Sequence, residues 1–297
     1  MLAPSSSIPV PSQIRAIVLL AVAGFASQAM VRSADSLLPQ IAGDFGVTVG
    51  AASIVVSAYT VVHGLMQLVS GPVGDRVGKY RVAIATALCA VLVFACGLAS
   101  SLPLLLAARI ASGMGADVVP YGRRQQVLGR YMSGQIIGQL FGQAAGGVIG
   151  DAFGWRTVFF VLAGLFAVAA LGLARELKVN PLTRETAHSA ATFASVVADY
   201  RRILGSSWVR IMLLAAFLEG AFMFGAFAYV GADLHVRFDL GFTLVGLVIG
   251  SFGVGGLMYA GFVRQLFTRF GEIGLASYGG ATLGIAYLML AVAPTWW

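Results

Sequence analysis

Apolar runs of membrane-spanning length alternate with short polar segments along almost the whole chain. They fall at 14–38, 50–70, 82–99, 102–119, 131–151, 156–174, 208–231, 241–263 and 272–293. A helix needs about 20 apolar residues to cross a hydrocarbon layer of roughly 30 Å, and most of these runs reach that length. The pattern predicts an all-α polytopic membrane protein with about nine transmembrane helices.

Composition supports the same class. The 297 residues are 59% hydrophobic and 10% charged, whereas a soluble domain carries about 25% charged residues. Residues 1–13 are rich in Ser and Pro, and we expect them to be disordered. The first apolar run, with Arg15 ahead of it, is compatible with a secretory signal peptide, but the apolar runs that follow favour a first transmembrane helix.

Basic residues gather in alternate polar segments. Most of the 19 Lys and Arg residues fall in the N-terminus and in 75–81, 121–130, 175–210 and 264–269. The positive-inside rule therefore predicts an inner (plasma) membrane protein with these segments and the N-terminus in the cytoplasm. Because the +7 net charge is explained by topology, no nucleic-acid partner is expected.

The long connection at 176–207 separates the predicted first half, 14–175, from a partial second half, 208–297. Within it, Phe193, Val196, Val197 and Tyr200 recur at helical spacing among charged residues. This predicts an amphipathic helix on the inner membrane surface, with a solvated linker as the alternative.

A dense charge cluster with spaced glycines lies between the second and third apolar runs. Because charge is costly in hydrocarbon, it predicts a tight basic loop between two membrane helices. Six of its residues resemble the signature loop of the major facilitator superfamily, Gly-x-x-x-Asp-Arg-x-Gly-Arg-Arg: Gly71, Asp75, Arg76, Gly78, Lys79 and Arg81. The resemblance implies a bundle of facilitator type and a gating role for this loop.

The short fourth run resembles the fourth-helix signature of the same superfamily through Leu105, Arg109 and Gly113. An arginine inside the membrane is a functional hypothesis by default. The family pattern continues for about a dozen apolar residues, but here Ala116 leads straight into Asp117. We infer a missing segment, with a naturally short helix as the alternative.

Spaced glycines in the fifth run allow close approach of helix backbones. They also resemble the fifth-helix signature of facilitator antiporters: Gly129, Gly138, Gly142, Gly146 and Gly147. Gln143 stands where that signature has a proline, which places a polar amide in the bundle. The loop Gly154-Trp155-Arg156 resembles the outer loop before the sixth helix, and we expect this loop to anchor at the membrane interface.

An internal repeat relates the two halves. Adding 193 aligns Tyr59 with Phe252, Arg76 with Arg269, and Gly78 with Gly271. Facilitator halves are parallel repeats of six helices with the substrate site between them. The resemblance thus implies twelve helices, and the chain is expected to be incomplete.

Three polar residues of the first run, Gln28, Arg32 and Asp35, fall on one helical face at i, i+4 and i+7. Asp35 precedes Pro39 by four residues, which resembles the acidic first-helix position of drug/proton antiporters. We expect Asp35 to carry the coupling proton, tuned by Arg32 or Arg109; an interfacial ion pair is the alternative. Glu219 is a second candidate for binding a proton or cation, against a structural role.

These features predict a secondary transporter that exports small amphipathic or cationic compounds, coupled to protons. Metabolite uptake or uniport on the same fold, and a truncated chain without transport, are the alternatives. The expected partners are a small-molecule substrate, protons and the lipid bilayer, while the oligomeric state is left open. The sequence holds no phosphate loop, paired-histidine metal site or nucleophile elbow, so neither an enzyme nor a cofactor or metal is expected. Cys89 and Cys96 are expected to pack in the third helix.

Overall fold

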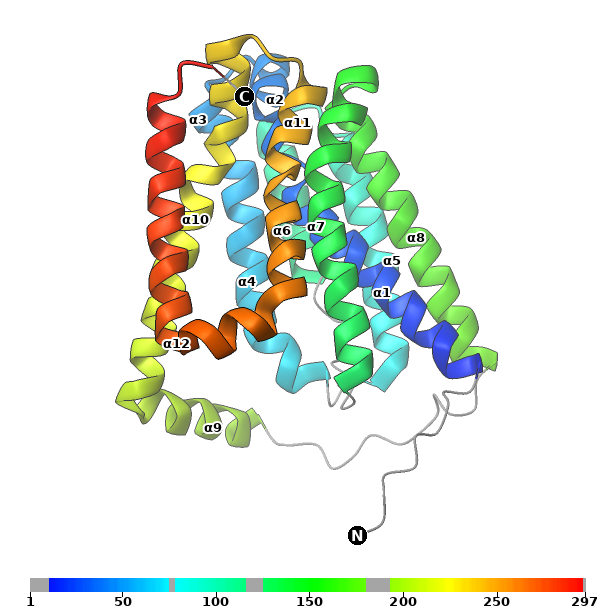
Figure 1. Ribbon diagram of the computed structural model, residues 1–297. Helices are drawn as coiled ribbons and strands as arrows, with labels where there is room; N and C mark the ends of the chain where they lie inside the picture. Colours follow the sequence, from blue (N-terminus) through cyan, green and yellow to red (C-terminus); the bar gives the residue numbers. More distant parts are fainter. Residues whose placement is uncertain (1–10, 75–77, 116–124, 180–192, 296–297) are drawn as a thin grey trace. The chain divides into compact units, whose positions relative to one another are not determined.

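The computed structural model describes residues 11–74, 78–115, 125–179 and 193–295, and every regular element in these ranges is a helix (Figure 1). In chain order these are α1 (Pro11–Arg32), η1 (Asp35–Leu37), α2 (Leu38–Phe45), α3 (Val49–Ala52), α4 (Ile54–Gly74), α5 (Gly78–Gly97), α6 (Leu102–Gly115), α7 (Gln125–Phe153), α8 (Trp155–Val179), α9 (Phe193–Gly205), α10 (Ser207–Phe238), α11 (Phe242–Gly250) and α12 (Phe252–Val292).

Several helices are long and apolar enough to cross a membrane. Among the described residues they are Val49–Gln67, Trp155–Glu176, Ser207–Phe238, Phe242–Tyr259 and Ile273–Val292. Two shorter apolar stretches, Ile84–Gly97 and Leu102–Met114, lie in α5 and α6. Helix α7 covers the fifth apolar run, and α1 covers the first run as far as Arg32. The predicted all-α membrane architecture is confirmed.

The first apolar run, 14–38, is not one continuous helix, so the prediction of a single membrane helix over that run is wrong. Helix α1 ends at Arg32, a 3₁₀ turn follows at Asp35–Leu37, and α2 begins at Leu38. Pro39 lies in the first turn of α2, where its missing N–H removes no helical hydrogen bond. Asp35 therefore lies in a turn between two helices and not on the continuous helical face that its spacing suggested.

Gly271, the residue of the second half that aligns with Gly78, lies at a sharp bend in a helix. Helix α12 contains non-helical geometry at Gly271, with φ 66° and ψ 179°, and Figure 1 shows the helix turning there. A positive φ of this kind favours glycine, which has no Cβ. Gly78 itself begins α5, so each glycine precedes a new run of helix.

Close residue contacts divide the chain into two compact units, each drawn from distant segments. The first unit comprises Met1–Val31, Ser57–Gln139 and Arg156–Ala191, and the second unit comprises Arg32–Val56, Leu140–Trp155 and Thr192–Trp297. The chain passes from one to the other within α1, α4, α7 and α8, and once more between residues 191 and 192.

Helices α5, α6 and α8 pack together in the first unit. The rings of Phe94 in α5 and Phe160 in α8 lie 5.0 Å apart, and Gly97 faces the Phe160 ring so closely that a Cβ would meet it at 2.5 Å. The Cys89 thiol donates to the Ser112 carbonyl of α6 at 3.8 Å. Both cysteines are buried thiols that are not joined in a disulfide, in keeping with the expected packing role.

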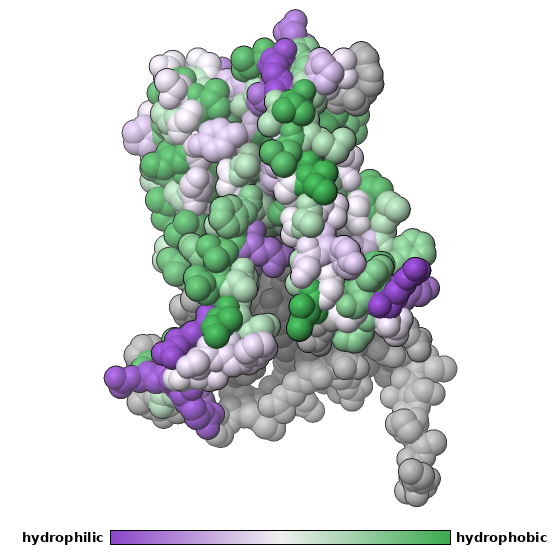
Figure 2. Space-filling view, turned by 60° about the vertical axis from the view of Figure 1, so that its left-hand side comes forward, coloured by the Kyte–Doolittle hydropathy of each residue, from purple (hydrophilic) through white to green (hydrophobic). Residues whose placement is uncertain are grey.

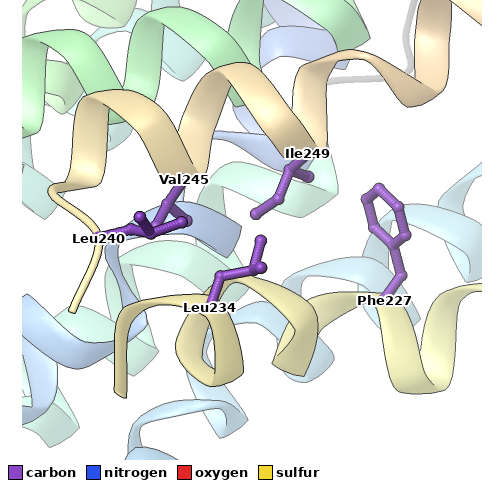
Figure 3. Close-up of a cluster of buried hydrophobic side chains, with 5 residues drawn as sticks. All are labelled: Phe227, Leu234, Leu240, Val245 and Ile249. Carbon is purple, nitrogen blue, oxygen red and sulfur yellow. The ribbon is translucent and has the colours of Figure 1, made fainter. Parts of the chain in front are cut away.

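Two contacts hold α10, α7 and α11 together in the second unit. Buried side chains of α10 and of the segment through α11 point toward one another and form one apolar cluster (Figure 3): Phe227, Leu234, Leu240, Val245 and Ile249. Helix α7 packs on α11 through glycines, because a Cβ on Gly147 would lie 2.3 Å from the Phe242 carbonyl oxygen. On the other helix, a Cβ on Gly246 would lie 2.9 Å from the Cα of Gly147.

The outer faces of α10 and α12 are apolar. Only 6% of the most apolar window of Ser207–Phe238 and none of that of Ile273–Val292 is buried within the protein, and Figure 2 shows hydrophobic side chains over this side. The helix predicted in the long connection is present as α9, which contacts α10 and leaves Val197 and Ile203 exposed. Such faces are suited to contact with hydrocarbon.

The glycine contact predicts a stability effect. Gly147→Ala forces the backbones of α7 and α11 apart, and overpacking of this kind costs roughly 1–3 kcal/mol. We expect the melting temperature of the purified protein to fall by about 2–10 °C. Gly164→Ala in α8 is the matched control, because nothing lies within 4 Å of its added Cβ and alanine favours helix. Equal melting temperatures for the two variants would contradict the packing role of Gly147.

Candidate functional site

The second unit contains a buried ion pair at the break between α1 and α2. Nη1 of Arg32, the last residue of α1, donates to Oδ2 of Asp35 at 3.2 Å. Arg32 is 4% exposed and Asp35 is 0% exposed. A buried pair of this kind is costly to break, because removing one partner leaves the other charge uncompensated. Of the two arginines expected to tune Asp35, Arg32 makes this contact.

Aromatic rings of α10 cover the guanidinium of Arg32. Its Cζ lies 3.9 Å from the ring centroid of Phe224 and 5.8 Å from that of Phe227. Both distances are within the range of cation–π attraction. The positive charge of Arg32 is therefore held by a carboxylate and by aromatic faces together.

Helix spacing explains why α10 presents these rings to the pair. Phe224, Phe227 and Gly231 follow one another at three- and four-residue steps, which places them on one face of the helix. At Gly231 an added Cβ would lie 3.2 Å from the Asp35 carbonyl oxygen, and α10 contacts η1. Because Gly231 has no side chain, α10 can approach the turn that contains Asp35, and both phenylalanine rings on this face of α10 lie next to that turn.

Helix α7 supplies polar groups next to the same turn. The Ser36 hydroxyl lies 3.5 Å from the Gln143 carbonyl oxygen, and Gly146 approaches the Ser33 carbonyl so closely that a Cβ would lie 2.8 Å away. The Gln143 side chain is fully buried, and its amide makes no hydrogen bond within the described part of the chain. The polar amide expected from the sequence is therefore inside the protein.

The first unit holds a second buried cation, Arg109 of α6. It is 0% exposed, and its Nη1 donates to the Met30 carbonyl of α1 at 3.0 Å. Its Cζ lies 4.2 Å from the Tyr59 ring centroid and 5.7 Å from that of Phe159. Arg109 thus ties α6 to α1, α4 and α8.

His63 of α4 packs on Tyr59, the ring that also contacts Arg109. Its ring stacks on Tyr59 with centroids 5.6 Å apart, and its Nε2 lies 3.4 Å from Nε2 of Gln67. Within the residues that the structure describes, no group of three metal-ligating side chains occurs.

Two other predicted site residues, Gln28 and Glu219, are less buried than the Arg32–Asp35 pair. Gln28 is half-buried one helical turn before Arg32, and Glu219 is exposed on α10. Glu219 forms no ion pair with any residue in the described ranges. Their predicted roles in proton or substrate binding stay predictions.

The glycines of α7 differ in how closely other helices approach. Gly138 faces the backbone of Phe25 in α1, where a Cβ would lie 2.3 Å from the carbonyl oxygen. Gly146 and Gly147 make the approaches described above, and Gly142 is buried. The surroundings of Gly129 are outside the described residues.

The proposed gate loop is largely outside the described residues. Asp75 and Arg76 lie in the undescribed segment 75–77, while Gly71 ends up in α4 and Gly78, Lys79 and Arg81 in α5. Only the helical backbone of these four is described. Helix α6 ends at Gly115, and Asp117 lies beyond it in the undescribed segment, so the inferred deletion stays a prediction.

Trp155, in the loop expected to anchor at the membrane interface, is instead buried inside the protein. Trp155 is 1% exposed, its Nε1 donates to Oδ2 of Asp44 at 2.9 Å, and its ring packs on Phe45 at 5.7 Å between centroids. A buried indole needs a hydrogen-bond acceptor, and the end of α2 supplies it. The aspartate and tryptophan are 111 residues apart, so no local pattern indicated this pair.

Asp151 of α7 is a second residue that the sequence did not single out. Its Oδ2 accepts hydrogen bonds from the Thr243 hydroxyl at 2.7 Å and from the Thr243 amide at 3.2 Å. Thr243 lies in the first turn of α11, whose amides have no helical partners. Asp151 therefore caps α11 from a neighbouring helix, where its negative charge also complements the helix dipole.

Comparison with known proteins agrees with this architecture. The model of the Major Facilitator Superfamily matches residues 20–297, and the chain belongs to that superfamily. Its fold is similar to that of a bacterial homolog of the human lysosomal transporter Spinster in an inward-facing and unoccupied conformation, with a TM-score of 0.65 and 17% identity. The alignment covers 88% of this chain and 64% of that chain, and at this identity the likeness shows the fold.

Two curated relatives are similar over most of this chain. An uncharacterized MFS-type transporter, YceJ of Bacillus subtilis (strain 168), is 26% identical over 271 residues, which cover 87% of this chain and 68% of that protein. A chloramphenicol resistance protein of Streptomyces lividans is 27% identical over 254 residues, which cover 80% and 62%. The chain spans about two thirds of the length of each.

The capping contact predicts measurable coupling between two helices. Asp151→Ala and Thr243→Val each remove the hydrogen bond between the side chains, so the double variant should lose less stability than the sum of the single variants. We expect a coupling free energy of about 1 kcal/mol from a double-mutant cycle on thermal or denaturant unfolding. The exposed pair Asp199–Arg202 is the control, with less than about 0.5 kcal/mol expected. Additive effects of the Asp151 and Thr243 changes would contradict the cap.

Proposed function

We propose that this protein exports small amphipathic or cationic compounds in exchange for protons, as a secondary active transporter. The observation that carries the proposal is the buried Arg32–Asp35 pair, in which a carboxylate can exchange its arginine partner for a proton. Membership of the superfamily supplies the transport class. The name of the Streptomyces relative, a chloramphenicol resistance protein, favours export over uptake.

The charge balance of the pair supplies the coupling. A proton on Asp35 removes the negative charge and leaves the guanidinium of Arg32 buried without its counter-ion. Uncompensated buried charge typically costs about 3–5 kcal/mol, which is enough to favour a conformation in which Arg32 reaches water. Loss of the proton reverses the preference, and alternating access of the facilitator fold then links proton movement to substrate movement.

The remaining predicted residues have supporting roles in this proposal. Arg109 holds the Met30 carbonyl two residues before Arg32, so a movement of α1 is transmitted to α6. The gate residues Asp75 and Arg76 fix the inner ends of their helices through charge-assisted contacts. Glu219 is a second proton or cation site on α10.

The coupling residue can be tested by transport. We expect Asp35→Asn to abolish accumulation of a cationic dye against its gradient in proteoliposomes with an imposed pH difference, while downhill exchange continues. The physical reason is that an amide cannot take up the coupling proton. Asp233→Asn is the control, because Asp233 is a partly exposed carboxylate of α10 that lies 3.7 Å from Arg237.

The outcomes of this assay distinguish proton-coupled export, uniport or uptake, and absence of transport. Dye accumulation that persists in Asp35→Asn would contradict coupling through Asp35. If the unaltered protein lets the dye equilibrate saturably across the membrane, at a rate that does not depend on the pH difference, it would act by uniport or uptake. Absence of any saturable flux would indicate a chain that does not transport.

The orientation is part of the same proposal, with the N-terminus in the cytoplasm and the protein in the inner membrane. Ala152 and Gly205 are both exposed, and the charge pattern predicts that they lie on opposite sides. Single cysteines at these positions, in a Cys89→Ala, Cys96→Ala background, should react with a membrane-impermeant maleimide from outside only at position 152. Labelling of both positions in intact cells would contradict this orientation.

A further inference from the structure

The guanidinium of Arg32 occupies what is, in chemical terms, a binding site for an organic cation. It lies between the carboxylate of Asp35, at 3.2 Å, and the face of Phe224, at 3.9 Å from the ring centroid. A carboxylate combined with aromatic faces is the arrangement that recognises cationic ligands in proteins. Here a side chain of the protein itself fills it.

The Arg32 guanidinium does not use all of its hydrogen-bond donors within the described part of the chain. A guanidinium carries five N–H donors in a fixed plane, and Nε of Arg32 makes no hydrogen bond within the described part of the chain although it is buried. Burying a donor without a partner costs free energy. If the Arg32 side chain moves into water, its Nε–H can form a hydrogen bond with water that it lacks in the buried position.

The walls of the site are held independently of Arg32. Phe227 belongs to the apolar cluster with Leu234 and Ile249 (Figure 3), and its ring packs on Phe252 at 5.1 Å between centroids. Asp35 is held in η1, against which α10 packs at Gly231. The Phe227 ring and the Asp35 carboxylate thus have supports that do not depend on the Arg32 side chain.

We propose that Asp35, Phe224 and Phe227 form a site for flat organic monocations, which Arg32 fills in the resting protein and from which a cationic substrate displaces it. The inference rests on the proposed function for its substrate class and adds the site and the mode of selection. Arginine is a planar, weakly hydrated cation, so ligands that replace it should share those properties. Neutral compounds of the same shape lack the attraction to Asp35.

Displacement predicts an effect of unusual sign: removal of a buried residue should strengthen binding. The probe is ethidium, a flat fluorescent cation, measured by equilibrium binding to the full chain in nanodiscs without a pH gradient, with empty nanodiscs subtracted. We expect Arg32→Met to bind ethidium at least tenfold more tightly than the unaltered protein. Phe224→Leu should bind it at least fivefold more weakly, and phenanthridine, a neutral analogue, should bind similarly to all three proteins.

Arg269→Met is the matched control, because Arg269 lies 5.7 Å from the Phe270 ring but is exposed on α12; its ethidium affinity should not change. Equal or weaker ethidium binding by a folded Arg32→Met would overturn the proposal. If that variant does not fold, Phe224→Leu decides alone, since the Phe224 ring is only half-buried, and an unchanged affinity there overturns it too. Because no gradient is used, these outcomes are independent of whether Asp35 couples transport to protons.

Discussion

The structure of the second unit depends on the burial of two opposite charges at a break in the backbone. Arg32 and Asp35 are close in sequence but belong to α1 and to the turn after it, and they meet because α1 ends where it does. In a medium of low dielectric constant neither charge is tolerated alone. The turn at Asp35, the aromatic rings of α10 and the glycines at the helix contacts together keep these two charges paired and out of the lipid.

Small residues set how closely the helices approach this pair. Gly231 admits α10 to η1, Gly146 admits α7 to the Ser33 carbonyl, and Gly147 lies against Gly246 of α11. Glycine is costly in an isolated helix, and membrane proteins accept that cost because van der Waals contact between backbones replaces the hydrophobic effect as the attraction between helices. The glycine content of 38 residues is thus partly explained by packing around polar groups.

Polar and apolar groups are distributed in the opposite way to those of a soluble protein. Arg32, Asp35, Arg109 and Gln143 are buried, while Leu288 and Val292 of α12 are 69% and 78% exposed. Apolar side chains are stable against lipid, and charged groups find counter-ions, carbonyls and aromatic faces only inside the protein. The buried cations are therefore the groups most sensitive to substitution, and they are also the candidates for function.

The sequence by itself determined the helical class and the approximate membrane spans, because hydropathy and charge vary over one turn or one loop and can be read locally. Its spaced motifs also suggested membership of the major facilitator superfamily. It also indicated Arg32, Asp35 and Arg109, since charge in an apolar run is visible without a structure. It misplaced the end of α1, because Pro39 is compatible with the start of a helix as well as its end. Only the tertiary structure showed that Arg32 contacts Asp35, that Phe224 and Phe227 cover it, and that Trp155 donates to Asp44. These contacts join residues up to 195 positions apart, and such pairings depend on how helices pack, which no local pattern encodes.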